Sequence, residues 1–203
     1  IIANAGSIGG SATMNGVNGF VSCDARVLDM KVLVVTSGTS EPDFPAITGA
    51  LDYLGTPYTV FDLSSAAMTP QYLANGCHGY FQGVIFTVAG YRYQIPGVGY
   101  LDTYEHDFQV RHLNWFAYPG TDFGLNPSTS SVPAVPPTPY PATYTSAGAA
   151  AFPYANTANP LIINYAQIYL STPYNGATPL LTDANGNALA VTYNTPWGSY
   201  QQL

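Results

Sequence analysis

The chain has 203 residues, of which 47% are hydrophobic and only 7% are charged. This length suits one domain, or one domain with an embellishment, and it is long enough to bury a sizeable core. About a quarter of the residues in an average globular domain are charged, so serine, threonine, asparagine, glutamine, glycine and tyrosine must cover much of this surface. Such surfaces are common in secreted proteins that work at cell walls or on polysaccharide.

The net charge is −7, with four basic residues in total. A nucleic-acid partner requires a basic patch that displaces counterions from the phosphates, and Arg26, Lys31, Arg92 and Arg111 cannot supply one. The same count excludes an anionic membrane surface, and no apolar run reaches the roughly 20 residues of a membrane helix. The composition therefore predicts neither a nucleic-acid nor a membrane partner, and it favours a neutral or cationic one.

The first 30 residues are predicted to form an N-terminal arm, because residues 1–22 are rich in glycine, serine and asparagine. The two cysteines of the chain are Cys23 and Cys77. In a secreted protein two cysteines favour one disulfide, here a bond that joins the arm to the first α/β unit. Two buried free thiols are the alternative.

Residues 31–126 are predicted to form an α/β core. The apolar, β-branched run Lys31–Thr36 is typical of a strand that is buried on both faces. Apolar residues at positions 44, 47, 51 and 54 predict a helix, with Ser40 as its cap and Pro42 in its first turn. Residues 58–61 form the expected second strand, which completes a β-α-β unit with a right-handed crossover.

The same alternation continues along the core. A short helix is expected over residues 69–74, and Gly83–Val88 is the third predicted strand. Helical spacing of apolar residues at positions 101, 104 and 108 precedes a fourth strand over Val110–Tyr118. Alternating strands and helices predict an open parallel sheet that helices cover on both faces.

Proline changes the pattern after Asn126. Residues 127–160 are predicted to be a proline-rich insertion, either a loop or a polyproline-like connector. Residues 161–203 are expected to form short strands, and Asn185–Gly186 between two apolar segments predicts a β-hairpin. All these parts, residues 1–203, are expected to form a single domain. The strand-like end at Leu203 suggests a segment of a longer protein.

Three segments together resemble a known family: Lys31–Thr36 with Pro57–Asp62, Tyr104–Arg111, and Pro179–Ala190. They are similar to the carbohydrate-binding module, of the family 87 type, that precedes the deacetylase domain in secreted microbial polysaccharide deacetylases such as the fungal galactosaminogalactan deacetylase. The resemblance implies a galactose and N-acetylgalactosamine polymer as partner, a catalytic domain in the same polypeptide, and no catalytic residue in this chain. The α/β part also looks like the flavodoxin-like fold of glutamine amidotransferases, which hosts both enzymes and inert modules.

Cys77 and His78 are candidates for catalysis, because amidotransferase-like enzymes use a cysteine nucleophile with a histidine base. That nucleophile lies between a strand and the following helix, whereas Cys77 lies before the third predicted strand. The adjacent His78 would also point away from Cys77 in an extended chain. A disulfide or a buried thiol is therefore the favoured interpretation.

The candidates for a metal site are Glu105, His106, Asp107 and His112. Neighbouring residues on a helix diverge, so the first three cannot all face one ion, and deacetylases of the metal type need an aspartate and two histidines at one divalent ion. A helix cap and an ion pair with Arg111 are the favoured interpretation. Neither a metal nor a cofactor is expected, and aspartates 43, 52 and 62 lack the pairing of glycosidase carboxylates.

Aromatic side chains supply the remaining candidate surface, with 17 tyrosines and two tryptophans. Sugar rings stack their apolar faces on aromatic planes, and tyrosine adds a polar hydroxyl. Ligands of open α/β sheets bind at the carboxyl ends of the strands, where the third predicted strand leads into residues 91–93. For each candidate the alternative is packing at the rim of the core, which is favoured for Trp115. The predicted carbohydrate-binding residues are Tyr91, Arg92, Tyr93, Tyr100, Tyr118, Asp122 and Trp197.

The sequence thus predicts a secreted, extracellular or cell-wall-associated module that binds carbohydrate and performs no catalysis. Two alternatives stay open. One is a structural domain that packs on the catalytic domain without touching sugar, and the other is a hydrolase.

Overall fold

The computed structural model describes residues 13–14, 17–18, 23, 25–87, 97–115 and 118–194. The described residues divide into two compact units, an N-terminal unit that ends at residue 115 and a C-terminal unit of residues 118–194. This boundary precedes the one at residue 126 that the proline content suggested. Whether both units belong to one domain stays a prediction.

A parallel β-sheet forms the middle of the described N-terminal unit, with the strand order β5-β4-β8-β9. Each neighbouring pair of strands is parallel. The predicted open parallel α/β class is therefore confirmed, and all four strands lie within or close to their predicted ranges. The strands are β4 (Val32–Thr36), β5 (Tyr58–Asp62), β8 (Gly83–Phe86) and β9 (Arg111–Asn114).

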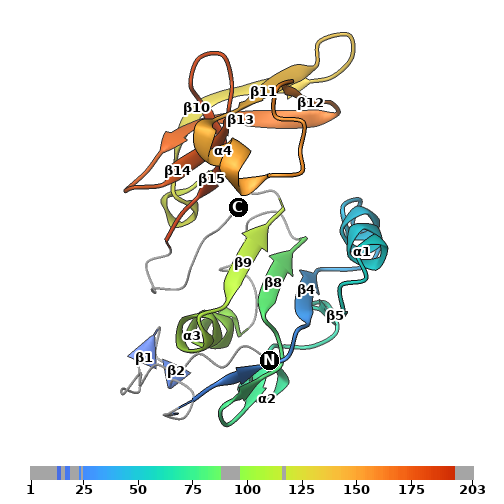
Figure 1. Ribbon diagram of the computed structural model, residues 1–203, viewed down its shortest axis with the longest axis vertical. Helices are drawn as coiled ribbons and strands as arrows, with labels where there is room; N and C mark the ends of the chain where they lie inside the picture. Colours follow the sequence, from blue (N-terminus) through green and yellow to red (C-terminus); the bar gives the residue numbers. More distant parts are fainter. Residues whose placement is uncertain are drawn as a thin grey trace. The chain divides into compact units, whose positions relative to one another are not determined.

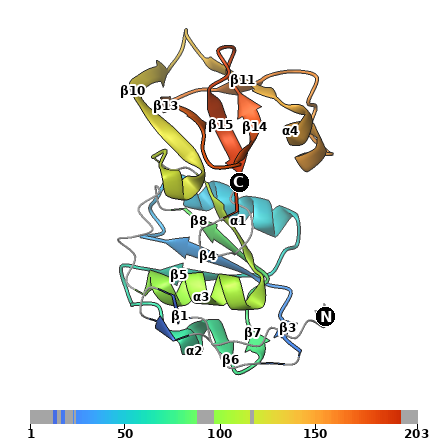
Figure 2. The same ribbon diagram turned by 90° about the vertical axis from the view of Figure 1, so that its left-hand side faces the viewer.

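Helices cover both faces of this sheet, as the sequence predicts. On one face, α1 (Phe44–Tyr53) packs its buried Ile47 and Leu51 against β4. On the other face, α2 (Pro70–Leu73) and α3 (Val98–Phe108) enclose the larger core. Figure 2 shows the sheet between α1 and α3. No helix among the described residues is long and apolar enough to cross a membrane.

The start of α1 differs from its prediction. Asp43 occupies the N-cap position, its side chain forms no capping hydrogen bond in the described chain, and Pro45 lies in the first turn. The predicted cap, Ser40, belongs to the preceding turn instead. The turn is held by the amide of Phe44, which donates to the carbonyl of Glu41 (3.1 Å). A hydrogen bond between backbone groups, and not a serine side chain, therefore stabilises the turn that leads into α1.

The predicted disulfide between Cys23 and Cys77 is confirmed, with a Cα–Cα distance of 5.8 Å. Cys77 lies in the turn between β6 (Ala74–Asn75) and β7 (His78–Gly79), and β7 pairs in parallel with β3 (Val27–Leu28). The bond therefore ties the segment before β3 to this small sheet, and it is compatible with an extracellular protein. Two further short strands, β1 (Thr13–Met14) and β2 (Val17–Asn18), pair with each other and contact α3.

The C-terminal unit consists mainly of antiparallel strands (Figure 1). A ribbon of β10 (Leu125–Ala134) and β13 (Ala166–Pro173) follows the short helix η2 (Thr121–Phe123). A separate sheet has the order β12-β11-β14-β15, and α4 (Ser146–Ala151) contacts β14. Its strands are β11 (Tyr140–Tyr144), β12 (Leu161–Ile163), β14 (Thr178–Thr182) and β15 (Ala188–Thr192).

The proline-rich segment forms strands, so its prediction as a loop or polyproline-like connector is wrong. Pro127 and Pro133 lie within β10, and Pro141 lies within β11. β10 pairs with β13 alone in the described sheets, and an edge strand tolerates proline because one row of its amides needs no partner. The predicted hairpin is confirmed: β14 and β15 are joined through Asn185–Gly186, where Gly186 adopts a φ of 82°.

Candidate functional site

The predicted carbohydrate-binding residues lie in different parts of the chain. Tyr100 is on α3, where it packs half-buried against the core. Tyr118 and Asp122 both lie at the start of the C-terminal unit, and Asp122 is half-buried within η2. Outside the described residues are Tyr91, Arg92, Tyr93 and Trp197.

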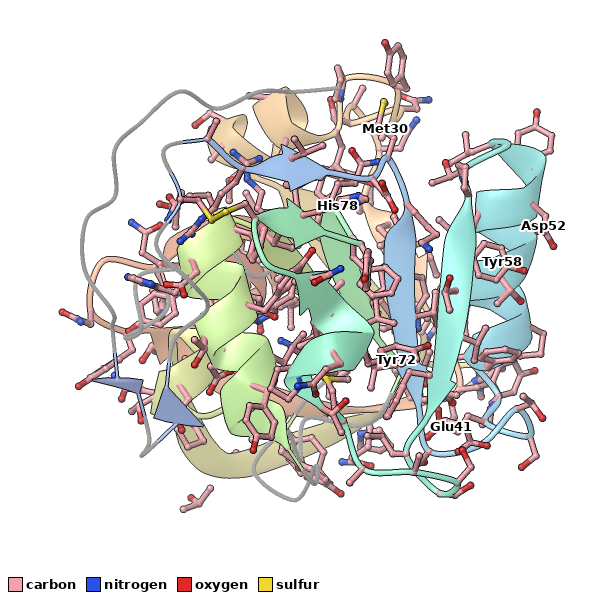
Figure 3. All side chains as sticks on the ribbon, turned by 90° about the horizontal axis from the view of Figure 1, so that it is seen from below. Met30, Glu41, Asp52, Tyr58, Tyr72 and His78 are labelled. Carbon is pink, nitrogen blue, oxygen red and sulfur yellow. A yellow bond between two sulfur atoms is a disulfide. The ribbon has the colours of Figure 1, made fainter. Side chains whose placement is uncertain are left out.

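A cluster of hydroxyls around a carboxylate lies where the strand order of the parallel sheet reverses. The chain passes from β4 to β5 on one side and then to β8 on the other, so the carboxyl ends of β4 and β8 form the switch point of the sheet. Glu41 lies beyond the carboxyl end of β4 (Figure 3). Its carboxylate accepts hydrogen bonds from the hydroxyls of Thr36 (2.7 Å), Ser37 and Thr87.

The hydrogen bonds keep Glu41 ionised. Burial raises the pKa of Glu41, but the three hydroxyl donors and the Ser37 amide lower it by more, so the pKa lies below its usual value. Each carboxylate oxygen accepts two of these bonds. Glu41 therefore fastens the loop between β4 and α1 and holds no proton for acid catalysis at neutral pH. Sequence reasoning missed it, although hydroxyl residues at the end of a buried strand and a glutamate in the next turn are a usable signal.

Trp115 follows β9 at the same edge, and its side chain is 51% exposed. The prediction that it packs in the core is wrong. Side chains alternate along a strand, and the buried faces of His112 and Asn114 place Trp115 on the opposite side. The carboxyl edge of the sheet thus carries an exposed indole as well as the hydroxyl cluster. The sequence predicted ligand contacts at this edge.

An exposed pair of aromatic rings lies in the C-terminal unit. The rings of Tyr118 and Tyr169 meet edge to face, with centroids 4.8 Å apart and planes at 62°. Their hydroxyl oxygens are 3.5 Å apart, and the side chains remain 44% and 37% exposed. Tyr118 was predicted as a site residue. Tyr169 was not, because it lies 51 residues further along the chain and only strand pairing brings it back.

Strand pairing also determines what surrounds Tyr169. Side chains two residues apart on one strand, and those opposite them on its partner, share a face of the ribbon. Tyr169 pairs with Ser131 and Gln167 pairs with Pro133, and all four residues are exposed, whereas the intervening Ile168 is half-buried. We define the tyrosine face as Tyr118, Ser131, Pro133, Gln167 and Tyr169.

The C-terminal unit is almost free of charge. No aspartate, glutamate, lysine or arginine occurs between Asp122 and Asp183. Asp183 is buried, and its carboxylate accepts hydrogen bonds from the Tyr140 hydroxyl and from the turn of the β14–β15 hairpin. The tyrosine face therefore offers aromatic rings, hydroxyls and one carboxamide, and none of its five residues carries an ionic group.

The four candidates for a metal site form two separate pairs. Nδ1 of His112 lies 2.8 Å from Oε2 of Glu105, and both side chains are fully buried. Nδ1 of His106 lies 2.8 Å from Oδ1 of Asp107. The predicted ion pair with Arg111 is wrong, because β9 turns His112 toward α3 and leaves Arg111 exposed on the opposite side. Among the described residues, no three His, Cys, Asp or Glu side chains are grouped so as to hold a metal ion.

Similar solved structures include a carbohydrate deacetylase and two glutamine amidotransferases. It matches Agd3, a carbohydrate deacetylase, with a TM-score of 0.69 and 18% identity over 87% of this chain and 29% of Agd3. It matches a glutamine amidotransferase from Methylobacillus flagellatus with a TM-score of 0.53 and 13% identity, over 81% of this chain and 66% of that one. A glutamine amidotransferase from Thermotoga maritima gives a TM-score of 0.53 and 11% identity, over 86% of this chain and 75% of that one.

These similarities concern the fold. No family model matches the sequence, and no curated protein matches it. The two amidotransferases confirm the predicted glutamine-amidotransferase-like α/β fold. The chain spans 29% of the length of Agd3.

Proposed function

We propose that this chain is a non-catalytic carbohydrate-binding module of a secreted polysaccharide deacetylase. It binds a polymer of galactose and N-acetylgalactosamine through the tyrosine face. The observation that carries this proposal is the pair of exposed, mutually fixed tyrosines, Tyr118 and Tyr169, on a ribbon without charge. The fold that the chain shares with part of a carbohydrate deacetylase supports the same assignment.

The angle between the two rings suits a pyranose. At 62° the rings form two sides of a shallow corner, so a sugar that stacks on one ring meets the edge and the hydroxyl of the other. The hydroxyl of Ser131 and the amide of Gln167 lie on the same face of the ribbon and both donate and accept hydrogen bonds. Because the rings support each other, little side-chain freedom is lost when sugar binds.

The proposal that the chain is non-catalytic is supported by the states of its cysteines and of Glu41, which are groups that a hydrolase could use. The chain has two cysteines, and the disulfide between Cys23 and Cys77 leaves it without a free thiol. The Glu41 carboxylate is fully occupied by hydrogen bonds. The hydrolase that the sequence left open would therefore need a nucleophile other than Cys77.

Calorimetric titration with galactosaminogalactan oligosaccharides tests the proposal. Tyr118→Ala and Tyr169→Ala should each weaken binding about tenfold, which corresponds to about 1.4 kcal/mol. Tyr154→Ala is the matched control, because this tyrosine of the same unit is fully exposed and lies outside the tyrosine face. Unchanged affinity in both tyrosine-face variants, or an equal loss in the control, would contradict the proposal.

One observation favours the structural alternative. β12 is an edge strand of its sheet, and Leu161 and Ile162 on it are 45% and 50% exposed. An edge strand with exposed apolar side chains suits pairing with a strand of another domain. In the structural alternative this is the catalytic domain of the same polypeptide. Ile162→Lys should then weaken association with that domain and leave sugar binding unchanged.

A further inference from the structure

Two arginines of the N-terminal unit line one cavity. The cavity has a volume of about 220 Å³, and its polar lining is Arg26, Gln82, Gln109 and Arg111. Met30 belongs to its apolar lining, and Figure 3 shows Met30 and Glu41 at opposite ends of β4. The cavity therefore lies at the amino ends of the strands, at the opposite edge of the sheet from its switch point.

The charges around this cavity are unusual for so acidic a chain. Half of the four basic residues line it, although the chain has eleven acidic residues. Nη1 of Arg26 is buried without a hydrogen-bond partner among the described residues, and the guanidinium lies 5.0 Å above the ring of Phe108. The carboxylate of Asp29, three residues further along the chain than Arg26, is hydrogen-bonded to Nε2 of His78 (2.7 Å). A buried guanidinium nitrogen without an acceptor is costly, so this arrangement favours an anion from outside the described chain.

The backbone holds the polar lining in place. Arg111 begins β9 opposite Gly83, and the amide of Gln82 donates to the carbonyl of Lys31 (2.9 Å). Gln109 follows α3 in the left-handed region with a φ of 57°, a conformation that favours glycine. Its Nε2 donates to the carbonyl of His106 (2.6 Å), which orients the side chain.

We propose that the cavity binds a single acidic sugar residue of the hexuronate class. Guanidinium groups hold carboxylates in bidentate pairs, and two of them face this space. A carboxylate alone would not need the two carboxamides, whereas sugar hydroxyls match their paired donor and acceptor atoms. Leu28 and Met30 supply an apolar wall for the C–H face of the ring. The volume lies below the roughly 300–1,000 Å³ of drug-sized sites and suits one ring.

Titration of the purified chain with digalacturonate at constant ionic strength, followed by NMR, tests this site. We expect saturable binding that shifts the side-chain amide signals of Gln82 and Gln109, with no saturable binding of the neutral galactobiose. Arg111→Ala removes an exposed guanidinium and should weaken binding about tenfold to a hundredfold. Arg26→Gln should do the same, with its fold checked by circular dichroism.

Lys31→Ala is the matched control. Lys31 is a basic residue of the same unit, its ammonium lies 5.0 Å above the ring of Phe81, and it does not line the cavity. An equal loss of affinity in this control would mean that general electrostatic attraction causes the binding, and it would overturn the proposal. Absence of digalacturonate binding would also overturn it. Equal affinity for acetate or sulfate, or tighter binding of an oligoglutamate peptide, would overturn the sugar class.

Discussion

Replacement of Asp183 by alanine should destabilise the C-terminal unit strongly. Its carboxylate accepts four hydrogen bonds: two from the backbone amides of Asn185 and Asn187 (2.8 Å each), one from Nδ2 of Asn187 (2.7 Å) and one from the Tyr140 hydroxyl (2.6 Å). Tyr140 belongs to β11, so the carboxylate fastens the β14–β15 hairpin to the neighbouring strand. At a net contribution of about 1 kcal/mol per bond, the variant should lose about 3–5 kcal/mol of its free energy of unfolding.

Urea unfolding followed by far-UV circular dichroism measures this loss. Asp183→Asn keeps one acceptor oxygen for the two turn amides, so it should lose about half as much as the alanine variant. Asp43→Asn removes the same charge where the side chain forms no capping bond in the described chain, and it should change stability by less than about 0.5 kcal/mol. A loss below about 1 kcal/mol in Asp183→Ala would refute the role of this carboxylate.

The same contacts predict two pH limits of stability. Burial raises the pKa of Asp183, but the bonds from Asn187, Tyr140 and the turn amides lower it below its usual value. Its contribution is therefore present above the unfolded pKa of about 3.9 and is lost as the pH falls through the lower folded value. Burial, the bond to Asp183 and the charge of Asp183 raise the pKa of Tyr140 to about 12, so this contribution is lost as the pH rises above about 10. In Asp183→Ala the free energy of unfolding should therefore depend less on pH, both at the acidic and at the alkaline limit.

Two further predictions concern packing and the disulfide. A Cβ at Gly148 would lie 2.0 Å from the carbonyl oxygen of Leu180, so Gly148→Ala should push α4 away from β14 and lower the free energy of unfolding by about 3 kcal/mol or more. At Gly49 nothing lies within 4 Å of the added Cβ, so Gly49→Ala should stabilise α1 by about 0.5–1 kcal/mol. Thermal unfolding distinguishes the two, and equal shifts would show the packing argument to be wrong. The disulfide spans 54 residues of sequence, so Cys23→Ser should lower the free energy of unfolding by about 4 kcal/mol, and an unchanged urea midpoint would contradict this.

Local patterns predicted the N-terminal unit well. The run that forms β4 is apolar throughout because both faces of the strand are buried, and the spacing that places Ile47 and Leu51 on one face of α1 follows from the helical period. The disulfide followed from the cysteine count. Predictions that depended on one side chain, such as the cap of α1 or the burial of Trp115, failed because backbone bonds and strand ends decided them.

Contacts between distant residues could not be predicted from local patterns. Tyr169 reaches Tyr118 only because β13 returns beside β10, and proline in β10 disguised that strand. Glu105 and His112 are seven residues apart, yet they meet because α3 folds back onto β9. A sequence shows which residues suit a sugar, but pairing of strands decides which of them share a face.

Titration of the purified chain against a panel of oligosaccharides tests the central claim most directly. The panel contains acetylated and deacetylated galactosaminogalactan oligosaccharides, with cellulose and chitin oligomers as comparisons. A carbohydrate-binding module with the proposed specificity should bind the galactosamine-containing ligands saturably and leave the other two unbound. Absence of binding to every ligand would contradict the account and favour a structural domain that packs on the catalytic domain.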